Sequence, residues 1–101
     1  MLNQVVLVGR LIADIEVIEK ENGDKVCTLT VACPQVNKNK DGIYETDNIK
    51  CILLDNFDNK IAEYCKKGTV MSIKGRVRES KEDNGIEIVA EKITCLSSKS
   101  S

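Results

Sequence analysis

Apolar and polar side chains alternate along several stretches of this chain, which is the pattern of half-buried β-strands. In residues 69–80, every second side chain from Met71 to Val77 is apolar or glycine, and most of the intervening side chains are polar. Residues 2–12 differ, because both alternating sets are mainly apolar there. A strand of that kind is buried on two faces, with the core on one side and another element or subunit on the other.

Five strands and one short helix account for the whole pattern. Turn-forming residues separate the strands, and Pro34 ends one of them because proline cannot donate to a strand ladder. Apolar side chains at helical spacing follow Asn56, and Gly68 is a natural helix stop. The predicted strands cover residues 2–12 (continuing through 15–19), 25–33, 43–54, 69–80 and 86–96, and the helix covers residues 57–67.

Three strands, a helix and two further strands follow one another in the order of the OB-fold, a five-stranded Greek-key barrel. We therefore predict an all-β OB-fold barrel with one short helix between strands 3 and 4. A barrel suits a chain of 101 residues because it closes its own edges without a large core. The predicted domain covers residues 1–96, and residues 97–101 form a polar end.

Composition narrows the chemistry that this barrel could perform. The chain has five cysteines, no histidine and no C-x-x-C pair, so neither a disulfide framework nor a zinc site has support. We expect reduced thiols in a cytoplasmic protein that has no metal, no cofactor and no contact with a membrane. No nucleophile or general-base arrangement is present in the sequence, so enzyme activity is not expected.

Several motifs resemble the bacterial single-stranded-DNA-binding protein family, in the same order along the chain. The run from Leu2 to Leu11, with Gly9-Arg10 near its end, is similar to the first strand of that family. The resemblance implies an OB-fold, binding of single-stranded DNA in replication, recombination or repair, and a homotetramer built from dimers. Further similarities lie at Gly23-Asp24-Lys25-Val26, Thr46-Asp47-x-Ile49-x-Cys51, Ala62-Glu63-Tyr64-x-Lys66-Lys67-Gly68 and Gly75-Arg76.

The family stacks bases on aromatic side chains at four places, and this chain has none of them there. By the order of the motifs, those places hold Asn37, Asn48, Leu54 and about Glu82. Each stacked base contributes about 1–3 kcal/mol, so three or four lost platforms weaken binding by about 3–9 kcal/mol. We therefore predict non-sequence-specific binding that relies mainly on phosphate contacts. Leu54 is either an apolar contact to a base or a core residue.

The charged residues argue both for and against binding of nucleic acid. Lys and Arg number 15 against 16 Asp and Glu, whereas a non-specific nucleic-acid binder usually has a basic excess. A cationic groove therefore requires that the carboxylates lie on the opposite wall, and carboxylates placed among the cations would neutralise it. The cations of residues 69–80 share one face of a predicted strand, which is either a phosphate-binding track or an ordinary solvated face.

Tyr44 follows a basic loop and either stacks on a base or is a half-buried strand tyrosine, the commoner case. The candidate nucleic-acid-binding residues are Arg10, Lys38, Lys40, Tyr44, Lys50, Leu54, Lys67, Lys74, Arg76, Arg78 and Lys81.

The second apolar face of the first strand, with Val6 and Val8, predicts an oligomer interface, in a dimer or a tetramer. Replication or repair proteins are further expected partners. An alternative function is an OB-fold protein-interaction or accessory module of a replication or primosome-type assembly, with little DNA binding. The near-neutral charge and the missing aromatics favour that alternative, whereas the cationic strand and the family motifs favour DNA binding.

Overall fold

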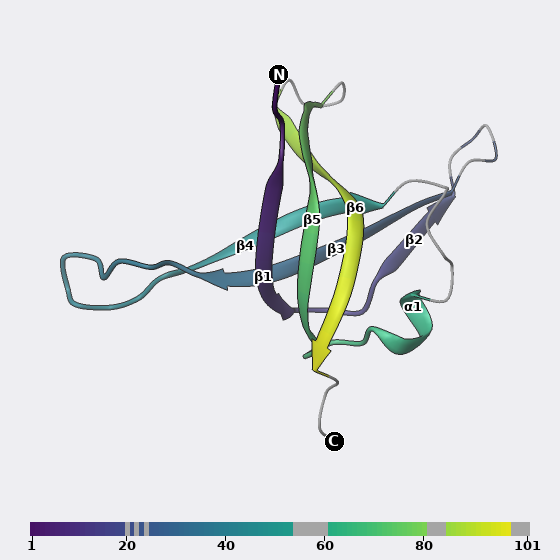
Figure 1. Cartoon of the computed structure of the whole chain (residues 1–101). Coiled ribbons are helices and arrows are strands. Elements are labelled where there is room, and N and C mark those ends of the chain that lie inside the picture. Colours follow the sequence, from purple (N-terminus) through teal and green to yellow (C-terminus); the bar gives the residue numbers. More distant parts are fainter. Residues whose placement is uncertain (20, 22, 24, 54–60, 81–84, 98–101) are drawn as a thin grey trace.

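The computed structural model describes residues 1–19, 21, 23, 25–53, 61–80 and 85–97. These residues form a strongly curved sheet and one short helix (Figure 1). The elements are β1 (Val5–Leu11), β2 (Glu16–Glu19), β3 (Lys25–Pro34), β4 (Thr46–Leu53), α1 (Ile61–Tyr64), β5 (Val70–Glu79) and β6 (Ile86–Ser97).

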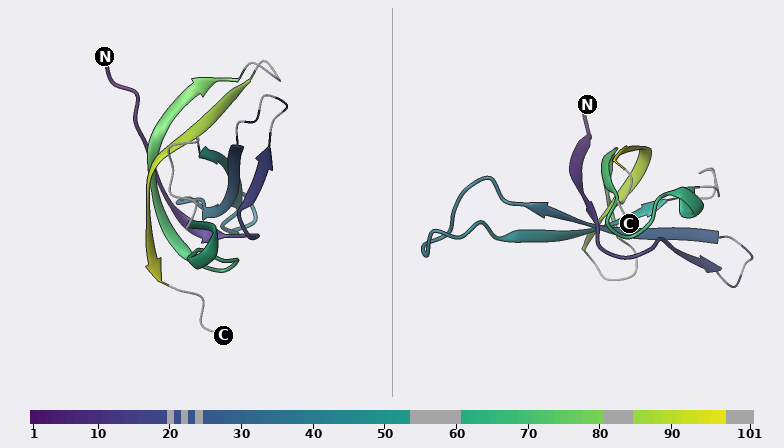
Figure 2. Two further views of the ribbon diagram at one scale, coloured as in Figure 1. Left: turned by 90° about the vertical axis from the view of Figure 1, so that its right-hand side faces the viewer. Right: turned by 90° about the horizontal axis from the view of Figure 1, so that it is seen from below.

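The sheet closes into a barrel because β1 pairs with two strands. The strand order is β1-β5-β6-β4-β3-β2, and β1 also pairs with β3 through Arg10 and Leu11. The β4–β6 pair is parallel and the other pairs are antiparallel. Five strands therefore enclose the core, β2 extends the sheet beyond β3, and the predicted all-β barrel is confirmed (Figures 1 and 2).

The sequence predicted one continuous first strand, and this prediction is wrong. The strand is interrupted between Leu11 and Glu16, which end β1 and begin β2. Before the break β1 pairs with β5, and after it β2 pairs only with β3. Within the break, Asp14 Oδ1 accepts a hydrogen bond of 2.8 Å from the backbone N–H of Lys67, which fixes the change of direction. The helix consequently lies between strands 4 and 5 of the structure, not between strands 3 and 4.

The other predicted bounds differ mostly at their ends. The strand expected over residues 43–54 begins at Thr46, and its last expected residue lies outside the described part of the chain. The described helix covers Ile61–Tyr64, and residues 57–60 of the prediction are likewise not described. None of the helices in the described residues is long and apolar enough to cross a membrane.

The core lies inside the barrel and is covered at one end by α1. Leu29, Val31, Leu53, Met71 and Ile73 point inward and are almost completely buried. Burial of apolar side chains stabilises the fold by about 25 cal/mol per Å² removed from water. Ile61 and Cys65, at either end of α1, belong to the same cluster.

Gly75 is a position that the barrel requires to be glycine. A Cβ atom there would lie 2.0 Å from the backbone oxygen of Val89 on β6. The β5–β6 register also shifts between Lys74 and Gly75, which indicates a β-bulge at this close approach. Just before β1, the Asn3 side chain forms two hydrogen bonds with the backbone of Val77: its Nδ2 donates to the Val77 oxygen, and its Oδ1 accepts from the Val77 N–H. These bonds extend the β1–β5 ladder.

The expectation that all five cysteines are reduced is wrong for two of them. A disulfide joins Cys65, directly after α1, to Cys95 near the end of β6. The two residues are 30 positions apart, and only the packing of α1 against the barrel brings them together, so their spacing carries no signal.

Among the free cysteines, burial and then the neighbouring Cys33 raise the pKa of Cys51 to about 11. Burial and then Asp47 raise the pKa of Cys33.

Candidate nucleic-acid interface

One row of directly paired residues crosses four neighbouring strands of the barrel, and within this row the side chain of Val89 is only 2% exposed. Thr28 of β3 lies opposite Ile52 of β4, Ile52 lies opposite Val89 of β6, and Val89 lies opposite Arg76 of β5. The residues that alternate with them, such as Leu29 and Leu53, belong to the core cluster. We call this outer surface of β3, β4, β6 and β5 the four-strand face.

Four of the predicted cations, namely Lys50, Lys74, Arg76 and Arg78, lie on the four-strand face. Lys50 is two residues from Ile52 on β4, and Arg78 is two residues from Arg76 on β5, so each points to the same side as its neighbour in the row. Lys50 is exposed and has no ion-pair partner within the described part of the chain. The face can therefore contact phosphates from at least two strands.

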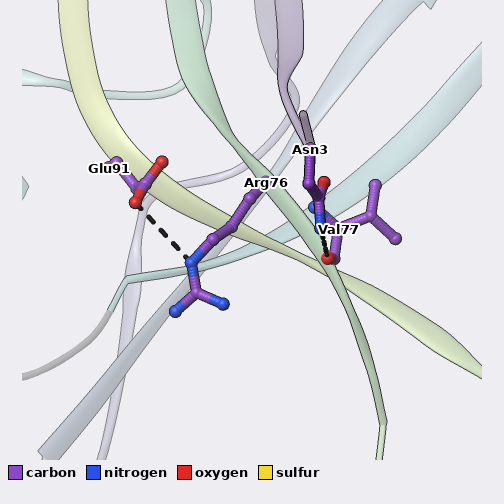
Figure 3. A network of polar contacts seen from close by, with 4 residues as sticks. All are labelled: Asn3, Arg76, Val77 and Glu91. Atoms are coloured by element: carbon purple, nitrogen blue, oxygen red, sulfur yellow. Dashed lines mark hydrogen bonds and ion pairs between the residues drawn. The ribbon is translucent and has the colours of Figure 1, made fainter. Parts of the chain in front are cut away.

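Carboxylates of β6 are interleaved with the two arginines. Arg76 Nε lies 3.6 Å from Glu91 Oε2, and Arg78 Nε lies 2.5 Å from Glu87 Oε1. Figure 3 shows the first pair, with the Nε edge of Arg76 turned toward Glu91 and the two terminal nitrogens turned away from it. The carboxylates are thus not on an opposite wall, and they offset much of the positive charge that β5 brings to this face.

The polypeptide between β3 and β4 forms an arm that projects from the barrel on the side opposite α1 (Figures 1 and 2). Asn39 holds its tip: Oδ1 accepts hydrogen bonds from the backbone N–H groups of Asp41 and Ile43, and Nδ2 donates to Glu45 Oε1. Gly42 has a φ of 76°, which the turn requires. The arm is therefore a defined hairpin end.

Two predicted site residues meet on this arm. The Nζ atom of Lys38 lies 5.5 Å from the centre of the Tyr44 ring, a cation–π distance. Tyr44 is 54% exposed, so it is not the half-buried strand tyrosine that the sequence favoured. Lys40 belongs to the same arm, which therefore presents two cations and one aromatic ring to solvent.

Other predicted cations lie away from the four-strand face. Arg10 donates a hydrogen bond of 2.7 Å to the backbone oxygen of Gly68, and Lys67 follows α1. Lys74, by contrast, is two residues from Arg76 on β5 and lies on the four-strand face, opposite Val6 on β1 and Lys92 on β6. The predicted site residues Leu54 and Lys81 lie outside the described residues.

A pocket of about 250 Å³ continues the four-strand face toward β2. Its lining is mainly polar and combines one cation with two carboxylates and two hydroxyl groups. The lining residues are Ala13, Asp14, Glu16, Thr28, Leu29, Thr30 and Lys50. The pocket offers both hydrogen-bond donors and hydrogen-bond acceptors to a ligand that lies along β3 and β4. Lys50 lies both in the pocket and on the four-strand face.

The sequence interpretation did not select three further residues of the row, namely the half-buried Thr28 and Ile52 and the buried Val89. They alternate with the core residues along each strand, but their alignment depends on the parallel β4–β6 pair. That pairing joins strands separated by α1 and β5, so no local pattern reveals it. On a different surface, Val6 and Val8 of β1 are 60% and 55% exposed.

Comparison with known proteins gives a consistent result. The model of the family described as "Single-strand binding protein family" matches residues 2–96. The chain is 34% identical to a single-stranded DNA-binding protein of Halalkalibacterium halodurans, over 100% of this chain and 64% of that protein. It is 37% identical to single-stranded DNA-binding protein 3 of Listeria innocua, over 98% of this chain and 66% of that protein. The chain thus spans less than two thirds of the length of these relatives.

Two solved structures show the same fold. A Plasmodium falciparum SSB in complex with ssDNA superposes with a TM-score of 0.75 at 20% identity, over 96% of both chains. A deletion mutant of the single-stranded DNA binding protein from Thermus aquaticus gives a TM-score of 0.72 at 23% identity, over 95% of this chain and 51% of that one. At these identities the likeness concerns the barrel and its topology.

Proposed function

This chain belongs to the single-strand binding protein family, and on that premise we propose that it binds single-stranded DNA without strict sequence specificity. The observation that carries the proposal is the four-strand face, which places Lys50, Arg76 and Arg78 on one side of the barrel with the half-buried Thr28 and Ile52 and is continued by a basic arm. Such a surface suits an extended strand better than a compact ligand, because its contacts are spread over four β-strands.

Phosphate contacts supply most of the binding in this proposal. Lys50 on the face and Lys38 and Lys40 on the arm would neutralise phosphates, and each such contact releases counterions. Tyr44 would stack on one base, which contributes about 1–3 kcal/mol. With a single ring on the arm and two ion-paired arginines on the four-strand face, we expect weak binding that depends strongly on salt.

Fluorescence anisotropy with a labelled oligo-dT tests the proposal at low salt. We expect saturable binding at micromolar protein, loss of most binding in the Lys38→Gln/Lys40→Gln/Lys50→Gln variant, and a smaller loss in Tyr44→Ala. A Lys67→Gln variant is the control, because Lys67 lies between α1 and β5 and so belongs neither to the arm nor to a strand of the four-strand face. No binding of any oligonucleotide at tens of micromolar would refute the proposal.

One observation favours a second candidate function. The pairs Arg76–Glu91 and Arg78–Glu87 leave part of the four-strand face nearly neutral, which suits a protein-interaction or accessory module of a replication assembly. The anisotropy experiment separates the two functions, because an accessory module of this kind would show little binding even at low salt.

We further propose that the protein is a homo-oligomer, a dimer or a tetramer, that works in the cytoplasm during replication, recombination or repair. The exposed Val6 and Val8 support a second copy on β1, because exposed apolar side chains on a strand favour association. Sedimentation should show a dimer or tetramer, and Val6→Glu/Val8→Glu should shift it to a monomer with an unchanged circular dichroism spectrum. A wild-type monomer at tens of micromolar would contradict this.

A further inference from the structure

Glu91 is a carboxylate on a surface that we propose contacts DNA, and the geometry points to a role in base selection. We infer that Glu91 accepts a hydrogen bond from an exocyclic amino group, so that the site favours cytosine over uracil or thymine. This inference rests on the proposed binding of single-stranded DNA and adds a preference among bases to it.

The position of Glu91 leaves its carboxylate available to a ligand. Its side chain is 57% exposed, and its one described contact is the 3.6 Å approach of Oε2 to Arg76 Nε. That distance is too long for a good hydrogen bond. The carboxylate therefore retains acceptor positions toward solvent. Glu91 projects here because the β5–β6 register skips one residue between Ala90 and Lys92.

Arg76 supplies the complementary group on the same spot. Only its Nε edge faces Glu91, and its two terminal nitrogens point away from the carboxylate (Figure 3). These nitrogens can bind a phosphate, or the guanidinium plane can lie against a base. A nucleotide held by Arg76 would thus bring the edge of its base near Glu91.

The chemistry of the base edge then decides the preference. Cytosine presents an N4 amino donor, which a carboxylate can accept, whereas thymine and uracil present an O4 acceptor at the same place. Two acceptors repel each other, so a carboxylate penalises thymine and uracil as well as rewarding cytosine. The phosphate backbone is the same in all three, so its attraction to the cations does not change this difference.

Glu87 provides a matched comparison on the same strand. Its side chain is only 22% exposed, and Oε1 is held by Arg78 Nε at 2.5 Å. Because this carboxylate is already engaged and more deeply covered, it should not discriminate between bases. Removal of Glu87 changes the net charge of the face by the same amount as removal of Glu91.

The test compares oligo-dC with oligo-dU by fluorescence anisotropy, at mildly alkaline pH so that cytosine stays unprotonated. These two bases share the ring and the 2-carbonyl group and differ along one edge: cytosine has a 4-amino donor and a bare N3, whereas uracil has an O4 acceptor and an N3–H. We expect the wild-type protein to bind oligo-dC about threefold to tenfold more tightly, the ratio given by one partly exposed charge-assisted hydrogen bond. In Glu91→Gln the ratio should fall to about one, because an amide can both donate and accept.

The control variant Glu87→Gln should keep the wild-type ratio even if it binds both oligonucleotides more tightly. Equal affinity of the wild-type protein for oligo-dC and oligo-dU, or an unchanged ratio in Glu91→Gln, would overturn the inference and leave the proposed function intact. Absence of binding to both oligonucleotides would overturn the proposed function and the inference together.

Discussion

Replacement of Glu87 by glutamine should strengthen binding of single-stranded DNA and make it more sensitive to salt. In the free protein, the Glu87 carboxylate engages Arg78 and competes with any phosphate for that guanidinium. Glutamine keeps the shape of the side chain but removes the charge, so Arg78 becomes available to a phosphate. This prediction follows directly from carboxylates that lie among the cations instead of apart from them.

The size of the effect follows from counterion release. One additional phosphate contact on a single strand adds about 0.7 to the slope of log K against log salt concentration. Between about 50 mM and about 200 mM salt, the advantage of the variant should therefore shrink about 2.6-fold. The ion pair is partly exposed, so its loss should lower the free energy of unfolding by about 1 kcal/mol or less.

Anisotropy titrations of one oligonucleotide at several salt concentrations measure both quantities. Glu63→Gln is the control, because it makes the same charge change on α1, on the side of the barrel away from the arm. The reasoning fails if the salt slope of Glu87→Gln equals that of the wild type, or if Glu63→Gln has the same effect.

Three further predictions concern the barrel. Gly75→Ala should lower the free energy of unfolding by about 3 kcal/mol, because its Cβ would overlap the Val89 oxygen; an unchanged urea midpoint would contradict this. At pH 8, Cys51 should carry about a hundredfold less thiolate than a thiol with the ordinary pKa of 9.0, because its pKa is raised to about 11. Alkylation followed by mass spectrometry should find it slow to react at pH 8 and faster as the pH approaches 11, and rapid labelling at pH 8 would refute the burial argument. Reduction of Cys65–Cys95 should cost up to about 3.6 kcal/mol, from a separation of 30 residues, whereas a Cys65→Ser/Cys95→Ser variant should unfold identically with and without reductant.

The strands were predictable where local alternation is strong. Residues 69–80 predicted β5 to within one residue at each end, and the turn formers around residues 20–24 separated β2 from β3. The break after Leu11 was not predictable, because apolar residues continue on both sides of it. The strand is interrupted where its pairing changes: β1 pairs with β5 along most of its length and meets β3 only at Arg10 and Leu11, whereas β2 pairs only with β3, and this pairing is a property of the whole barrel.

The candidate site divides in the same way. Lys74, Arg76 and Arg78 were selected from the alternation of their strand, and they do share one face. Lys50 was selected as a cation that matches the family, and the pairing of β4 with β6 brings it to the same face. The contacts of Glu87 and Glu91 with the arginines depend on the β5–β6 register, which the sequence does not specify. The pairing of β5 with β6 therefore decides whether the cations that alternate along β5 form a positively charged surface.

The place of β6 between β5 and β4 has a consequence for folding during synthesis on the ribosome. Translation delivers β6 after every other strand, although it occupies the middle of the strand order. A nascent chain can pair β1 with β5 and β3 with β4, but the β4 and β5 edges stay open until Ser97 has left the exit tunnel. Open edges invite pairing with other chains. This small barrel is thus most exposed to misassembly in the interval between the synthesis of β5 and the release of β6.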